Sequence, residues 1–262
     1  MTMAAALPRR LLWTWVGLVY AFMYLPVAVI ALFSFNASKI VAFPLQGFTL
    51  DWYARVLSDG RILGGLGVTF LVAIPTAIAA TVLGAMAALA LTRSNLRHPI
   101  AFASLLFLPF LVPKVILAVA QLIVLSELGL GRGLATIVIG QTLIILPFTT
   151  LVVASVLVRL DRRLEEAAAD LGADEGQIFR RVLFPLMKNG LVAAFFVAFV
   201  LSSSEYVVTS FVSGRTQPLA ILVASDFRFD LSPSLDALAV LMVVVNLAIV
   251  AVGEIVRRAG RG

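Results

Sequence analysis

Six long apolar segments constrain the fold of this chain more than any other feature. Each is nearly free of charged side chains, and they cover about residues 11–35, 64–91, 100–126, 133–158, 190–213 and 235–256. A bilayer core about 30 Å thick takes about 20 apolar residues of helix, so each segment is long enough to span it with some tilt. The sequence therefore predicts an all-α polytopic membrane protein with about six transmembrane helices, in a single transmembrane domain over 1–262.

The composition supports this prediction and excludes several classes of protein. Hydrophobic residues make up 61% of the 262 residues and charged residues 13%, which lies outside the usual range of soluble domains. Cysteine is absent, so the chain has no disulfide framework and no thiolate chemistry. Arg9 and Arg10 precede an apolar run that is too long for a signal peptide, so we expect a retained first helix.

The basic residues indicate topology rather than a nucleic-acid partner, because they cluster beside the apolar segments. With six spans, thirteen Lys and Arg residues fall on the side of the two termini and six on the opposite side. The positive-inside bias then predicts that both termini and the loop 159–189 are cytoplasmic.

The loop 159–189 is too long to be a simple connector. Its composition predicts two short helices, at about 161–171 and 174–182, which meet at Gly172 before Pro185 marks the entry to the fifth span. Arg162 and Arg163 stand at helical spacing from Glu166 and could pair with it. Such a rigid projection suits docking or force transmission better than adhesion to anionic lipid, because its acids nearly balance its bases.

This loop resembles the EAA signature of permeases of type I ABC importers. In that signature Glu-Ala-Ala is followed by Gly four residues after the second Ala, then by nine residues and Ile-x-Leu-Pro. The matching positions here are Glu166, Ala167, Ala168, Gly172, Val182, Phe184 and Pro185. The resemblance implies a coupling helix that sits in a cleft of the ATPase subunit. The residues expected to form this coupling site are Glu166, Ala167, Ala168, Asp170, Leu171, Gly172, Ala173 and Pro185.

The same resemblance implies the partners and the location. They are two ABC ATPase subunits, a second permease that is identical or homologous, and an extracytoplasmic substrate-binding protein, assembled in the lipid of the bacterial inner membrane. ATP hydrolysis is expected in a separate subunit, since Lys39, Lys114 and Lys188 are not followed by the Ser or Thr of a phosphate-binding loop. No cofactor or metal is expected, because His98 is the only histidine.

Two shorter segments, 48–53 and 210–214, resemble the spermidine/putrescine-type subgroup of these permeases. In that subgroup a pair of Asp residues usually precedes the second segment, whereas this chain has 202–205, Ser-Ser-Ser-Glu. A polyamine, a zwitterionic amino compound and an aminophosphonate therefore all stay open as substrates. The aromatic residues of the first segment, Trp52 and Tyr53, suit either the membrane interface or the docking of a binding protein.

Lys114 and Glu205 are charges within predicted spans, and with Ser204 they are our candidates for the translocation pathway. They lie fourteen and fifteen residues along spans that start at 100 and 190, at similar depths of about 21–23 Å, so they could pair. Charges within spans also suit a self-sufficient secondary transporter. That alternative leaves the inner loop unexplained, and an intramembrane enzyme is a more distant third.

Overall fold

The computed structural model of the chain describes residues 9–40, 42–227 and 232–259. Long helices carry the fold, and no β-strand occurs in these three stretches. Among the described residues, five helices are long and apolar enough to cross a membrane: α1 (Arg9–Phe33), α3 (Gly60–Arg93), α6 (Leu134–Leu157), α9 (Phe184–Ser203) and α12 (Pro233–Ala259). A bent pair, α4 (Pro99–Leu111) and α5 (Lys114–Glu127), can supply a sixth crossing. The predicted all-α fold with about six spans is confirmed.

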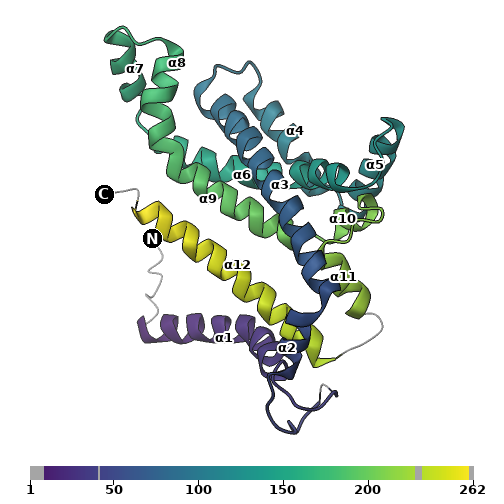
Figure 1. The fold of residues 1–262 in the computed structure, drawn as a ribbon. Coiled ribbons are helices and arrows are strands. Elements are labelled where there is room, and N and C mark those ends of the chain that lie inside the picture. The colour runs from purple at the N-terminus through teal and green to yellow at the C-terminus, as the bar shows by residue number, and fades with distance from the viewer. Residues whose placement is uncertain (1–8, 41, 228–231, 260–262) are drawn as a thin grey trace, which may run out of the picture. The chain divides into compact units, whose positions relative to one another are not determined.

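Short helices occupy the connections between these spans (Figure 1). They are α2 (Asp51–Ser58), α7 (Arg163–Asp170), α8 (Glu175–Ile178), α10 (Val207–Val212) and α11 (Leu219–Phe227), together with a π-helical turn, η1 (Phe179–Leu183). The chain forms two compact units. One comprises Met1–Gly60 with Asp226–Val245, and the other Arg61–Ser225 with Asn246–Gly262.

The third predicted span, 100–126, is not one continuous helix. α4 ends at Leu111, α5 begins at Lys114, and the two helices are bent by 104°. The cause is Pro113, which has no backbone N–H to donate and forces the residue before it out of the helical region. Val112 accordingly has an extended backbone, with φ −88° and ψ 131°.

The fifth predicted span, 190–213, is also interrupted. α9 ends at Ser203, and α10 follows a break at 204–206. The Glu205 carboxylate accepts the backbone N–H of Val208 at 3.1 Å, so a side chain replaces the helical partner at the start of α10. The depths inferred above assumed unbroken helices, and the two breaks invalidate that estimate.

The first unit contains an ordered loop before and around α2. The Trp52 indole N–H donates to the Asn36 carbonyl at 2.7 Å, and the Tyr53 hydroxyl lies 2.6 Å from that of Ser34. Only 6% of Trp52 is exposed. Trp52 therefore holds its own loop together and is not free for the interface or docking roles that its sequence suggested.

The second unit is held by close approaches between helices. A Cβ added at Gly84 of α3 would lie 2.2 Å from the Thr149 hydroxyl oxygen of α6, and one added at Gly190 of α9 would lie 2.8 Å from a Val156 methyl group. Thr149 also donates to the carbonyl of Ala80 in α3 at 2.7 Å. Gly84 and Ala88, which is fully buried, form a small-xxx-small pair of the kind that lets membrane helices approach closely.

Buried polar groups fix the break between α9 and α10. The Gln141 side chain of α6 donates to the Thr209 hydroxyl at 2.8 Å and accepts a hydrogen bond from the Ser202 hydroxyl. Thr209 in turn donates to the Glu205 carbonyl at 2.7 Å. Gln141 thus links the last turn of α9 to the first turn of α10, and only 1% of it is exposed.

The end of α10 is fixed by the start of α6. The Val212 carbonyl accepts the Gly133 backbone N–H at 3.2 Å and the Thr136 hydroxyl at 2.9 Å. A helix leaves its last carbonyls and its first N–H groups without internal partners, and here one helix end satisfies the other.

Close packing at Gly84 predicts that one added methyl group destabilises the protein. Gly84→Ala should lower the free energy of unfolding by about 1–3 kcal/mol, because α3 and α6 must separate to admit it. The matched control is Gly67→Ala in the same helix, where a Cβ would meet nothing within 4 Å. The control should be neutral or slightly stabilising. The thermal unfolding midpoints of both purified variants, compared with that of the parent, measure these effects. An equal loss of stability in the two variants would contradict the packing argument.

The role of Gln141 can be tested against a second buried glutamine. Gln121 of α5 is 8% exposed, and its amide has no hydrogen-bond partner within the described residues. Gln141→Met should cost about 1–3 kcal/mol, because it leaves the Ser202 hydroxyl without its acceptor, whereas Gln121→Met should be neutral or stabilising. Thermal unfolding midpoints measure both effects. A larger loss for Gln121→Met would show that the network does not stabilise the break.

Candidate functional site

The loop 159–189 forms two short helices that turn sharply at Gly172, as predicted. The Gly172 N–H bonds to the Ala169 carbonyl at 2.9 Å, and the Ala173 N–H bonds to the Ala168 carbonyl at 3.0 Å. This pair of bonds is a Schellman motif, which places a glycine in the left-handed region. Gly172 has φ +86°. Asp174 then caps α8 by accepting a backbone N–H three residues on, at 2.8 Å.

The tip of this loop is exposed on α7 and the turn that follows it. Leu171 is 90% exposed, which is unusual for a large apolar side chain in a polar loop. Among the other predicted coupling residues, those exposed are Glu166, Ala167, Asp170, Gly172 and Pro185, and those half-buried are Ala168 and Ala173. Within the second unit, α7 and α8 lie at the end away from α10 (Figure 1).

The charged residues of the loop pair differently from the spacing-based prediction. No ion pair joins Glu166 to Arg162 or Arg163 in the described part of the loop. Arg162 instead donates to a backbone carbonyl at the end of α3. Glu165, the neighbour of Glu166, pairs with Arg93 of α3 at 2.7 Å. Glu166 itself is exposed.

Pro185 does not interrupt the helix at the entry to the fifth span. Helical structure runs from Glu175 to Ser203, and Pro185 is the second residue of α9. The π-helical turn η1 ends just before it, at Leu183. Because proline cannot donate to the carbonyl four residues earlier and clashes with it, the wider turn there gives a physical reason for the continuity.

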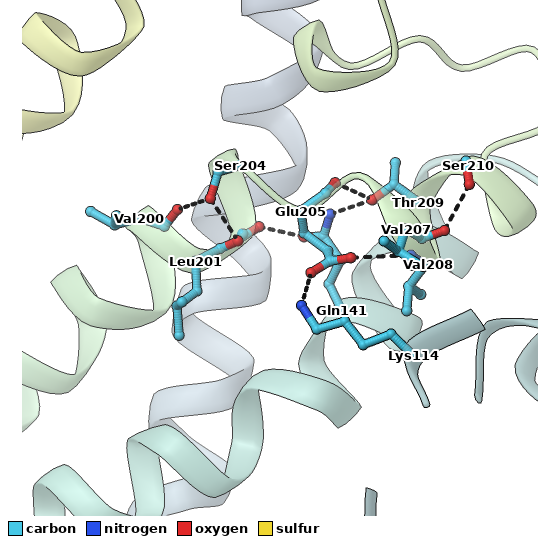
Figure 2. Close-up of polar contacts among 11 residues, drawn as sticks. Lys114, Gln141, Val200, Leu201, Ser204, Glu205, Val207, Val208, Thr209 and Ser210 are labelled. Carbon is cyan, nitrogen blue, oxygen red and sulfur yellow. Dashed lines mark hydrogen bonds and ion pairs between the residues drawn. The ribbon is translucent and has the colours of Figure 1, made fainter. Parts of the chain in front are cut away.

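Lys114 and Glu205 form an ion pair between the two helix breaks (Figure 2). The Lys114 ammonium lies 3.0 Å from one Glu205 carboxylate oxygen, and the other oxygen accepts the Val208 N–H at 3.1 Å. The Lys114 side chain is 62% exposed and that of Glu205 only 7%. The carboxylate is therefore the fixed member of the pair, and the ammonium is on the open side.

A small cavity of about 110 Å³ adjoins this pair. Apart from the two charged residues, its lining is apolar: Pro109, Phe110, Val112, Leu117, Ile144, Ile145, Phe148 and Leu201. A water molecule takes about 30 Å³ of liquid volume, so the cavity admits one polar end group rather than a whole drug-sized solute.

Ser204, the third predicted pathway residue, does not join the ion pair. Its hydroxyl donates to the Val200 carbonyl at 3.0 Å, back along α9, and its side chain is exposed (Figure 2). Sequence reasoning missed Gln141 and Thr209, which fix the position of Glu205 through the backbone. The only local sign of this network was a polar residue, Gln141, within the apolar run 133–158.

Comparison with known proteins shows similarity over nearly the whole chain. Residues 80–261 match the family model described as binding-protein-dependent transport system inner membrane component. The chain is 31% identical over 241 residues to the spermidine/putrescine transport system permease protein PotC of Escherichia coli strain K12, covering 92% of this chain and 91% of that protein. It is 32% identical over 231 residues to the putrescine transport system permease protein PotI of the same organism, covering 85% and 82%.

The fold is also that of a known transporter structure. A bacterial ABC transporter involved in the import of the acidic polysaccharide alginate aligns with a TM-score of 0.64 at 15% identity, over 95% of this chain and 94% of that one. The helix arrangement is thus shared with that transporter. From the family match over 80–261 and the extended similarity to PotC and PotI, this chain belongs to the family of binding-protein-dependent transport system inner membrane components.

Proposed function

We propose that this chain is the membrane-spanning permease subunit of an ABC importer for a small polar amine-type solute such as a polyamine. It forms half of the translocation pathway and hydrolyses no ATP itself. The projecting loop with its exposed EAA segment carries the proposal, because a self-sufficient secondary transporter, the alternative left open by the sequence, has no use for such a loop.

The loop has the properties of a docking element. Its turn is rigid, because two backbone bonds and a left-handed glycine fix it, and Leu171 at its tip offers an exposed apolar anchor. Glu166 adds an exposed charge beside this anchor. We assign coupling to an ATPase subunit to Leu171 and Glu166 together with Ala167, Ala168, Asp170, Gly172, Ala173 and Pro185. The importer would contain two such ATPase subunits.

The orientation and the other partners complete the proposal. Thirteen basic residues on one side, against six on the other, favour a cytoplasmic location for the loop and both termini; Arg261 of the thirteen and Arg228 of the six lie outside the described residues. A second permease, identical or homologous, supplies the other half of the pathway. An extracytoplasmic substrate-binding protein delivers the solute to the outer side of the bacterial inner membrane.

The charge pair narrows the kind of solute. Glu205 can receive an ammonium group, and the nearby cavity has room for one such end group. Lys114 cancels that charge, so this subunit alone favours a zwitterionic amine or an aminophosphonate over a bare polycation. A polyamine fits if the partner permease contributes further acids. Similarity to PotC and PotI favours the polyamine.

The natural lack of cysteine permits a direct test of ATPase docking. Ala169→Cys, at an exposed position of α7, should join to the ATPase subunit through a thiol-to-amine crosslinker, giving one new band of the summed mass. Asn95→Cys is the matched control, because it is exposed in the short loop between α3 and α4 on the same proposed side. Crosslinking from position 95 alone would refute the assignment of the coupling loop.

The pathway role of the ion pair predicts losses in transport that do not add. Lys114→Ala and Glu205→Ala should each reduce uptake and solute-stimulated ATP hydrolysis about tenfold, with the double variant little worse, because each single change already breaks the same pair. Uptake of labelled putrescine and of a zwitterionic amine measures the effect. Normal transport in all three variants would remove both residues from the pathway. Additive losses would show that they act separately.

A further inference from the structure

We infer that Arg93 is the positioning residue that carries movement of the coupling loop into helices α3 and α6. The inference rests on the proposed function, since it names the route by which the docked loop would act on the membrane helices. Arg93 is the last residue of α3 and lies outside the EAA segment. The EAA sequence signature does not include Arg93.

Arg93 first joins α3 to the end of α6. Its guanidinium donates to the Leu157 carbonyl at 3.0 Å and to the Leu160 carbonyl at 3.1 Å. These carbonyls lie at and just beyond the last residue of α6, where helical partners run out. A cation is also favoured at the C-terminus of a helix, so one side chain satisfies both carbonyls and complements the helix dipole.

The same guanidinium holds the coupling helix. Arg93 Nε lies 2.7 Å from Glu165 Oε1 of α7, and the two side chains are only 13% and 21% exposed. Water and salt screen such a pair less than an open surface pair. Arginine suits this position because its planar fork presents several donors at fixed angles, whereas lysine offers a single charged point.

A second contact ties the loop to the same turn of α3. Arg162, just before α7, donates to the carbonyl of Thr92. The Thr92 hydroxyl donates to the Ala88 carbonyl at 2.8 Å. Two basic side chains, one from each partner, thus cross between the loop and the end of α3, which limits rotation as well as separation.

The helix ends beneath this clamp pack as one block. Buried apolar side chains from α3, α6, α9 and the turn before α9 form a single cluster: Ala88, Val153, Leu157, Leu183, Met187 and Ala194. Leu160, whose carbonyl binds Arg93, packs against that cluster. Close-packed interiors shift between discrete arrangements rather than deform gradually, so a pull on Arg93 moves α3 with α6.

The test separates transmission from docking. In the importer complex, Leu63→Cys reports on the first turn of α3, about 45 Å from Arg93 along the helix. Its labelling by a maleimide should change when ATP and vanadate are added. Glu165→Gln keeps both Arg93–carbonyl bonds but removes the ion pair. It should leave ATPase copurification and ATP hydrolysis intact, while the nucleotide-dependent change in labelling falls about tenfold.

Controls and contrary outcomes are distinct. Glu127→Gln removes one exposed acid at the end of α5 and should behave as the parent. Arg93→Lys cannot donate to both carbonyls and also hold the ion pair with Glu165, so it should be impaired like Glu165→Gln. The role of Arg93 is overturned if Glu165→Gln keeps the nucleotide-dependent change in labelling, or if the parent shows no such change. Either outcome leaves the importer assignment standing. If no ATPase copurifies with the parent chain, the proposed function itself fails.

Discussion

Hydrocarbon offers a peptide group no hydrogen-bond partner, and the arrangement of the second unit depends on that constraint. Two apolar stretches that would span as single helices are broken, at Val112–Pro113 and at 204–206. Backbone groups freed at membrane depth cost several kcal/mol each unless protein groups satisfy them. Glu205 and Thr209 satisfy groups at the second break, and Gln141 holds both of its sides. At this break, buried polar side chains thus serve backbone groups that the helix ends leave free.

This constraint also explains why a charge pair can exist there. A lone carboxylate in lipid is costly, but Glu205 accepts a backbone N–H with one oxygen and an ammonium with the other. Breaks in transmembrane helices recur at transport sites because irregular backbone is tolerated where it lines a cavity. In the proposed importer, the groups that repair the break thus double as groups that meet the solute.

Length and apolar composition were enough to predict the spans, because both are local properties of the sequence. The turn at Gly172 was also predictable, since a glycine between two helix-forming stretches is a local signal. The two helix breaks were only partly predictable. A proline at position 113 indicates a kink, but it does not by itself predict a bend of 104°. The end of α9 depends on Gln141, 61 residues from Ser202, and a contact over that separation leaves no local pattern. The pairing of Glu165 with Arg93, 72 residues away by number, was missed for the same reason.

The two polar centres differ in how firmly their charges are held, and this difference suits their proposed roles. At the loop, both members of the Arg93–Glu165 pair are largely buried, so the contact resists separation. At the breaks, Glu205 is buried but Lys114 is 62% exposed at the first turn of α5. A long exposed side chain can leave its partner without unfolding the helix that carries it. An entering ammonium group could then replace that of Lys114 on Glu205 while the carboxylate keeps its bond to Val208. Force transmission needs a contact that holds, whereas passage of a solute needs one that exchanges.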